Sequence, residues 1–142
     1  MTDTDHQDPT GQPHRVAVVQ AAPVAFVTDR TIQKVADLAA DASRRGARLE
    51  LFPEAFVSAY PRGLGFGAVV GARTAAGREQ FRLHWESAIE VPGPYTDHLS
   101  RIARTNRIHL VSGSSSGTSA PSTAQYSSSL FFGPDGGYIG RP

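Results

Sequence analysis

Apolar residues in this 142-residue chain fall into short runs and periodic stretches that predict alternating strands and helices. Residues 15–22 form a continuous valine-rich run, which is typical of a buried parallel strand. Thr28 or Asp29 can cap a following helix, Gly46 is suited to its end, and residues 48–52 form a second strand. The apolar positions of this helix recur at helical spacing: Ile32, Val35, Ala36, Ala39 and Ala42. The three elements predict a βαβ unit.

The rest of the chain continues this alternation. The pattern predicts a helix over 75–90, ended by Pro92-Gly93-Pro94, and another helix starting at Tyr95 or Thr96. The apolar faces of the two helices are formed by Phe81, Trp85, Ala88 and Ile89 in the first and by Leu99, Ile102 and Ala103 in the second.

Strands are expected over 107–112 and 125–132, followed by a turn at 134–137 and a returning strand over 138–140. The glycine-rich residues 60–71 and the serine-rich residues 114–123 are expected to form loops, which lie between the predicted elements. Alternating strands and helices predict a fold of the α/β class.

Composition narrows the possible functions. The chain has no cysteine, which excludes disulfides and thiolate metal sites, and its net charge of +1 predicts no general attraction to nucleic acid or membranes. No apolar run is long enough to span a bilayer. Residues 1–14 are polar and lack the apolar centre of a signal peptide, so we expect a disordered N-terminal arm and a cytoplasmic protein. No cofactor or metal site is predicted, because no ligand spacing links the five histidines His6, His14, His84, His98 and His109.

The most specific chemical signal lies around Glu54. The short apolar strand before it stops at Pro53, because proline cannot donate to a sheet ladder. Glu54 therefore follows the carboxyl end of a strand, which is where ligands bind in open α/β sheets. Carboxylates in such positions also serve as helix caps or structural partners, so position alone leaves both roles open.

Residues 51–67, LFPEAFVSAYPRGLGFG, resemble the first signature of the nitrilase family, the carbon–nitrogen hydrolases. Further resemblances follow in the family's order from about Val16 to Gly140. They comprise residues 16–23 for the opening strand, 46–48 before the signature, 77–82 and 88–94 for the aryl- and alkyl-nitrilase branch, and 130–136 for the hairpin before the catalytic lysine.

The resemblance implies a hydrolase that converts an organic nitrile into a carboxylic acid and ammonia, using a Glu, a Lys and a Cys with a second Glu assisting. In the family a thiol attacks the nitrile carbon, and the lysine stabilises the developing negative charge. Glu54 matches the general base of this set. Tyr60 is expected either to line the substrate pocket or to pack as an ordinary aromatic residue. The chain ends at Gly140-Arg141-Pro142, before the family's Lys and Cys, and its only lysine is Lys34.

We therefore expect residues 15–142 to be a partial nitrilase domain, truncated before the catalytic Lys and Cys and inactive alone. The alternative is a catalytically inactive fragment that at most binds or co-assembles with a partner. The resemblance implies the first half of a four-layer α-β-β-α sandwich with one sheet face left bare, which favours a homo-oligomer or association with a C-terminal half. Candidates for this face are Val16, Val18, Leu49, Leu51, Ile108 and Leu110, or their neighbours one step along.

Two further motifs do not support other functions. Residues 113–117, GSSSG, match the G-x-S-x-G motif of serine hydrolases. A nucleophile elbow needs a helix directly after this motif, but the residues that follow here have the composition of a loop. Residues 63–68, GLGFGA, match G-x-G-x-x-A but begin about ten residues past a strand end, whereas a dinucleotide site needs its glycines between strand and helix.

Glu50 is unusual because it falls in the middle of a predicted strand, where the family usually has an aliphatic residue. A carboxylate is costly there unless a cation such as Arg48 pairs with it. The alternatives are that the strand lies near an edge, or that the core is no longer under selection for tight packing.

Overall fold

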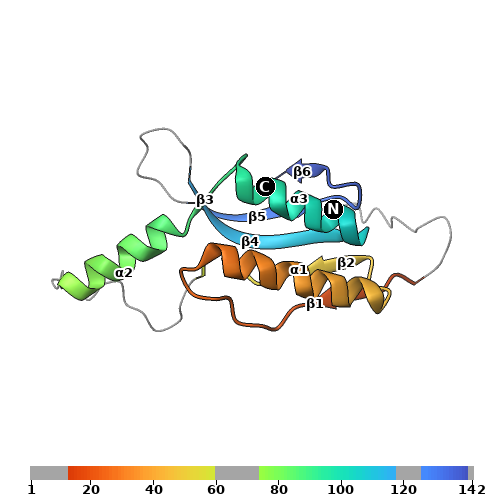
Figure 1. Ribbon diagram of the computed structural model, residues 1–142, viewed down its shortest axis with the longest axis horizontal. Helices are drawn as coiled ribbons and strands as arrows, with labels where there is room; N and C mark the ends of the chain where they lie inside the picture. Colours follow the sequence, from red (N-terminus) through yellow and green to blue (C-terminus); the bar gives the residue numbers. More distant parts are fainter. Residues whose placement is uncertain (1–12, 60–73, 118–125, 141–142) are drawn as a thin grey trace, which may run out of the picture.

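The computed structural model describes residues 13–59, 74–117 and 126–140, which form three helices and one mixed sheet (Figure 1). In chain order the elements are β1 (Val16–Val18), α1 (Thr28–Arg44), β2 (Leu49–Leu51), α2 (Ala75–Glu86), β3 (Ile89–Glu90), α3 (Pro94–Asn106), β4 (His109–Gly117), β5 (Tyr126–Phe132) and β6 (Tyr138–Gly140). Most of the predicted arm, the loop over 60–71 with Tyr60 and the GLGFGA motif, and residues 118–123 lie outside the described residues.

The sheet has the strand order β1-β2-β4-β5-β6. β1, β2 and β4 run parallel, and β5 and β6 extend the sheet in the antiparallel sense. β3 pairs in parallel with the far end of β4. The chain passes through α1 between β1 and β2 and through α3 between β3 and β4, since parallel neighbours need long crossover connections. The α/β class and the opening βαβ unit are confirmed.

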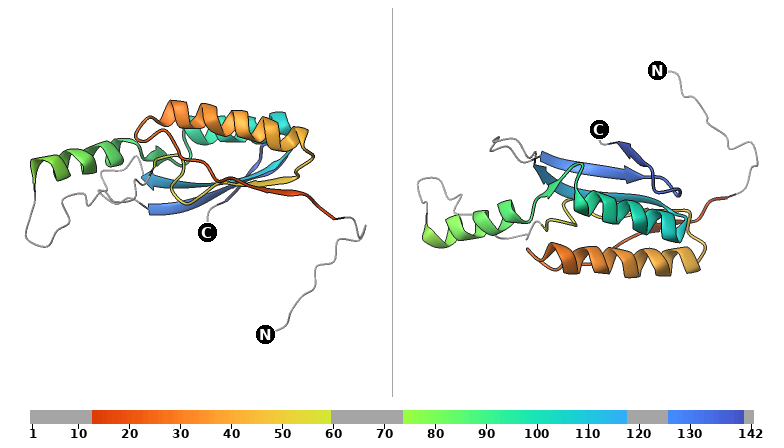
Figure 2. Two further views of the ribbon diagram at one scale, coloured as in Figure 1. Left: turned by 90° about the horizontal axis from the view of Figure 1, so that it is seen from below. Right: turned by 45° about the horizontal axis from the view of Figure 1, so that its top comes forward.

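α1 and α3 lie side by side on the same face of the sheet, as both views of Figure 2 show. The predicted apolar stripe of α1 is confirmed: Ile32, Val35, Ala39 and Ala42 are buried, and Ala36 packs at the edge of the core. Gly46, with φ of +81°, follows the helix end as expected, because glycine adopts this left-handed conformation without strain.

α3 begins slightly earlier than the sequence pattern indicates, at Pro94. The backbone N–H of Gly93 donates to the Thr96 hydroxyl over 2.8 Å, and that hydroxyl lies 2.7 Å from the Gly93 carbonyl oxygen. Proline suits the first helical position because its missing N–H would have no helical partner there. The predicted stripe of Leu99, Ile102 and Ala103 is buried.

Strand alternation divides the side chains of the sheet between the helix-covered face and an opposite, open face that no described helix covers. Leu110, Leu130 and Phe132 join the core beneath the helices. The residues at a neighbouring position of each strand pair with one another and lie on the open face: Val18, Leu51, Val111 and Phe131. Val18 remains 66% exposed and Leu51 41% exposed.

Two predictions about this face need correction. β1 is not buried, because it has one described neighbour, β2, and the helices cover only one side of it. Of the two sets of candidates for the open face, the first is correct for the residues of β1 and β2, but in β4 the neighbours one step along lie on this face and Ile108 and Leu110 are buried. The register pairs Leu49 with His109, so the alternate residues of β4 share the open face.

The helix expected over 75–90 ends at Glu86. The Ser87 hydroxyl lies 2.7 Å from the carbonyl oxygens of both His84 and Ser58, which fixes the chain at the point where it leaves the helix. Ile89 is buried as a residue of β3 rather than on a helix face, and Phe81 is 50% exposed.

β4 is longer than the strand predicted over 107–112. The serines expected to begin a loop are buried in β4, where Ser114 and Ser115 pair with Ser128 and Ser127 of β5 and Ser116 pairs with Tyr126. The hydroxyl groups of Ser116 and Ser128 lie 2.8 Å apart between the two strands. Buried hydroxyls that are hydrogen-bonded in this way do not oppose strand formation.

Candidate functional site

Glu54 lies in the turn that follows β2, at the carboxyl end of the parallel strands. Its side chain is exposed, and its Oε1 accepts a hydrogen bond of 2.9 Å from the Ser127 hydroxyl of β5. Ser127 alternates with the buried Ser128, which places it on the open face. The carboxylate therefore reaches over the open face of the sheet from β2 toward β5.

The loop that carries Glu54 fills a gap along one edge of β4. β2 pairs with the start of β4 and β3 pairs with its end, and residues 52–58 connect to β4 between them. The backbone N–H of Phe52 donates to the Val111 carbonyl oxygen over 2.8 Å, and that of Val57 donates to the Gly113 carbonyl oxygen over 3.2 Å. The loop is thus bound to the sheet on both sides of Glu54.

Gly113 allows the loop to approach β4 closely. A Cβ atom on Gly113 would lie 2.5 Å from the Pro53 carbonyl oxygen and 2.6 Å from both the Ala55 nitrogen and the Glu54 Cα. These atoms all belong to backbone, so a flexible side chain cannot move aside to make room. Glycine in a strand commonly marks such a close approach, and here it sets the height of the Glu54 backbone above the sheet.

The far end of the loop is held by buried polar contacts. The Ser58 hydroxyl accepts a hydrogen bond of 2.7 Å from the backbone N–H of Ser115, and Nδ1 of His84 lies 3.1 Å from the Ala59 carbonyl oxygen. Ala55 and Ala59 have φ values of 50° and 61°, which are strained for residues with a Cβ atom. These anchors from β4 and α2 hold a loop conformation that the local sequence does not favour.

Of the two site residues that the sequence predicts, Glu54 and Tyr60, only Glu54 lies within the described residues, and the chain's lysine is far from it in sequence. Lys34 lies on α1, and its ammonium donates to the Ala22 carbonyl oxygen over 2.8 Å, away from the open face. Tyr60 is outside the described residues. No cysteine occurs in the 142 residues. Within the described ranges, no cluster of three or more His, Asp or Glu side chains is arranged to hold a metal ion, and no helix is long and apolar enough to cross a membrane.

Glu50 does not pair with Arg48 or any other cation among the described residues. Its side chain points to the helix-covered face, is 1% exposed, and leaves Oε2 without a described hydrogen-bond partner. Burial, with a smaller contribution from the charge of Asp41, raises the pKa of Glu50 to about 7. Glu50 and Glu54 therefore lie on opposite sides of the sheet and belong to different environments.

The sequence singles out Glu54 as a candidate residue but does not identify the residues that position it. Gly113 could have been recognised from the rule that a strand glycine marks close backbone approach, but its strand was expected to end one residue earlier. No local signal identifies Ser127, which is 73 residues away from Glu54.

Comparison with known proteins gives a consistent family assignment. The family model described as Carbon-nitrogen hydrolase matches residues 15–142. Nitrilase 3 from Arabidopsis thaliana is 40% identical over 127 residues, which cover 89% of this chain and 36% of that protein. Aliphatic nitrilase from Sinorhizobium fredii is 41% identical over 122 residues, which cover 86% of this chain and 39% of that protein. The chain thus spans little more than a third of the length of these relatives.

The fold is shared with solved structures. A mutant of the amidase from Nesterenkonia sp. AN1 in complex with butyramide matches with a TM-score of 0.63 at 24% identity, covering 94% of this chain and 43% of that one. The helix-on-sheet layer described above therefore corresponds to part of a larger fold. Because the family match extends from β1 through the Glu54 loop to β6, the chain belongs to the carbon–nitrogen hydrolase family.

Proposed function

We propose that this chain supplies the N-terminal part of a nitrilase, an enzyme that converts an organic nitrile into a carboxylic acid and ammonia. The observation that carries the proposal is the placement of Glu54 beyond the carboxyl end of β2, on a loop fixed to β4 by the close approach of Gly113. The similarity to Nitrilase 3 and Aliphatic nitrilase favours a nitrile as the substrate. The Cys and Lys of the reaction would come from polypeptide outside these 142 residues.

In this proposal Glu54 acts as the general base. It takes the proton of the attacking thiol while the thiol sulfur bonds to the nitrile carbon, and water then releases the acid and ammonia. A base must be held at a defined distance from the nucleophile. The backbone bonds on both sides of Glu54 and the 2.9 Å hydrogen bond from Ser127 support such positioning.

A chimera tests this role directly. Residues 15–142 replace the matching part of the Aliphatic nitrilase from Sinorhizobium fredii, and ammonia release from aliphatic nitriles is measured. We expect the chimera to be active and its Glu54→Gln variant to lose about 10²–10⁴-fold in kcat. Glu90→Gln, an exposed change of the same chemistry on β3, serves as the control and should keep full activity. Equal activity of the two variants would remove Glu54 from the reaction.

A second function is favoured by the open sheet face. An apolar face that no described helix covers suits a catalytically inactive chain that binds a partner or co-assembles with it. The chimera separates the two proposals, because a chain that serves only in assembly would give a folded chimera without nitrile hydrolysis.

A further inference from the structure

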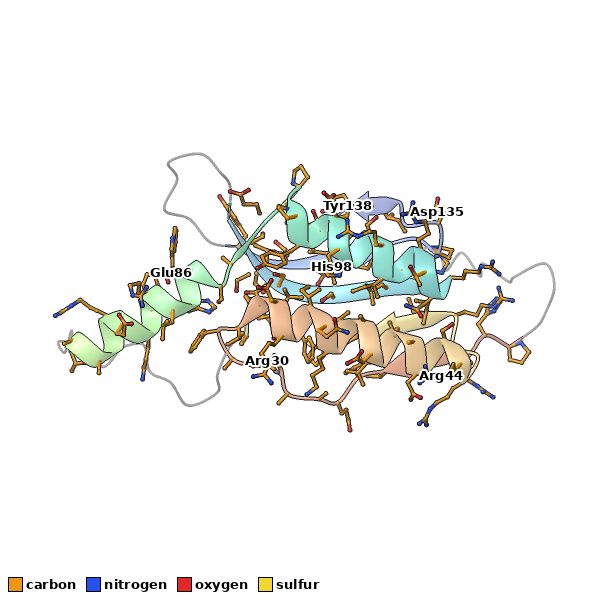
Figure 3. The ribbon with its side chains drawn as sticks, viewed as in Figure 1. Arg30, Arg44, Glu86, His98, Asp135 and Tyr138 are labelled. Carbon is orange, nitrogen blue, oxygen red and sulfur yellow. The ribbon has the colours of Figure 1, made fainter. Side chains whose placement is uncertain are left out.

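A pocket of about 280 Å³ lies between β1 and the C-terminal half of α1. It is separate from the Glu54 loop, since it belongs to the helix-covered side of the sheet. Figure 3 labels Arg44 in the last turn of α1, which precedes the pocket-lining residue Arg45 in the chain. Its lining combines residues 17–21 of β1 and the following segment with Leu38, Asp41, Ala42, Arg45 and Glu50.

Glu50 is part of the lining of this pocket, and no described cation pairs with its carboxyl group. Glu50 is 1% exposed, and its Oε2 has no hydrogen-bond partner among the described residues. The cation of the described lining, Arg45, is already paired: its Nε lies 2.8 Å from Oδ2 of Asp41, and the two side chains are 75% and 43% exposed. A buried carboxylate without a donor is costly, so the pocket contains an acceptor that a ligand can satisfy.

We propose that this pocket binds a primary ammonium group on a short aliphatic stem, with Glu50 as its counter-ion. An ammonium offers three donors on one small centre. Asp41 lies close enough to Glu50 to influence its ionisation and adds a second negative charge. The apolar side chains of Leu38 and Ala42 suit the methylene stem.

The chemistry of the lining argues against a metal ion. Calcium takes about six to eight oxygen ligands, whereas the described lining offers two carboxylates, one of them engaged by Arg45. An ammonium on an aliphatic stem can come from a free alkylamine or from a lysine side chain of another polypeptide segment. The two sources share the same charge and stem and differ in whether a backbone is attached.

Titration of n-butylammonium chloride at pH 8 into the 142-residue chain tests the proposal, with ionic strength held constant by sodium chloride. We expect a saturable rise in Tm on the order of a few degrees. 1-Butanol has the same stem without the charge and should give no saturable rise. Lysine blocked at both backbone ends is the second ligand. If it binds as well as butylammonium, the pocket accepts a lysine side chain that is attached to a polypeptide. If it does not bind, the ligand is a free amine.

Variants connect the response to the pocket. Glu50→Gln is nearly isosteric and should abolish the rise in Tm, and Asp41→Asn, on the surface of α1, should weaken binding several-fold. Glu90→Gln should respond like the unchanged chain. Lowering the pH from 8 to 5 should also abolish binding, because Glu50 takes up a proton and loses its negative charge. The other titratable groups of the described lining are Asp41 and Arg45. An equal rise in Tm in Glu50→Gln would overturn the proposal. So would the absence of a saturable rise in the unchanged chain when n-butylammonium is added from 100-fold the concentration of protein up to about 0.1 M.

Discussion

The hydroxyl of Ser127 donates a 2.9 Å hydrogen bond to the carboxylate of Glu54, which joins β5 to the loop that follows β2. The bond lies on the exposed side of the sheet, whereas the next serine, Ser128, is buried and lies 2.8 Å from the Ser116 hydroxyl. Two adjacent serines thus make hydrogen bonds in opposite environments.

This contrast predicts different effects of removing each hydroxyl. Ser127→Ala should change the free energy of unfolding by no more than about 0.5 kcal/mol, because water replaces the lost hydroxyl. Ser128→Ala should lower it by about 1 kcal/mol, since the buried Ser116 hydroxyl loses one of its contacts. Urea unfolding of both variants gives the comparison, and a larger loss for Ser127→Ala would contradict the assignment of the open face.

Gly113→Ala should strongly disturb the Glu54 loop. The added Cβ would meet backbone atoms of Pro53, Glu54 and Ala55 at 2.5–2.6 Å, so we expect a loss of about 1–3 kcal/mol or more in the free energy of unfolding. Gly117→Ala, in the same strand, is the matched control because its added Cβ would meet nothing within 4 Å. If the two variants unfold at the same urea concentration, the close approach of the loop to β4 is wrong.

The buried carboxyl of Glu50 predicts an unusual dependence of stability on pH. Its pKa is raised from 4.5 to about 7 in the folded chain, so between these values the unfolded chain releases a proton that the folded chain keeps. Stability should therefore fall as pH rises through this window, by on the order of 3 kcal/mol from this group. Below about pH 4.5 and above about pH 7 its contribution becomes constant.

Glu50→Gln should remove that slope. The variant should match the unchanged chain near pH 4 and exceed its free energy of unfolding at pH 8, as measured by urea unfolding at a series of pH values. Glu90→Gln should keep the pH dependence of the unchanged chain. The same slope in Glu50→Gln would show that another group causes it.

The 142-residue chain by itself should not hydrolyse nitriles. It has no cysteine to supply the thiol, and its lysine lies on α1 in contact with the Ala22 carbonyl oxygen. Catalytic groups that act as a unit lose most of the rate when one of them is removed. Ammonia release from benzonitrile or phenylacetonitrile above a buffer blank, abolished by Glu54→Gln, would refute this prediction.

The open sheet face should make the chain self-associate. The exposed apolar side chains of β1 and β2, among them Val18 and Leu51, form part of a patch on the order of several hundred Å², which soluble monomers rarely expose. We expect association in sedimentation velocity, and the double variant Val18→Lys with Leu51→Lys should reduce it. A compact monomer with a sharp, concentration-independent melting transition would contradict the prediction.

The parts of the fold that the sequence predicts are those with local causes. The stripe of α1 follows from helical spacing, and the end of β2 follows from Pro53. The family follows from the signature around Glu54. In each case the residues that carry the signal are neighbours along the chain.

The parts that could not be predicted depend on residues that are distant in sequence. Serine favours loops by composition, yet β4 continues through its serines because those of β5 supply cross-strand partners. The helical pattern runs on to Ile89, but α2 ends at Glu86, and the Ser87 hydroxyl that follows it donates to the Ser58 carbonyl oxygen. The side of the sheet on which β4 presents each residue is fixed by its register with β2, and no property of β4 alone reveals it.

The position of β4 has a consequence for biosynthesis. β2, β3, β5 and the Glu54 loop all hydrogen-bond to β4, which begins only at His109. Before that residue leaves the ribosome, the described strands of the nascent chain can form just the three-residue pairing of β1 with β2, and a two-stranded pairing is marginally stable at best in water. We expect the first hundred or so residues to emerge largely unassembled and to depend on chaperones until β4 appears.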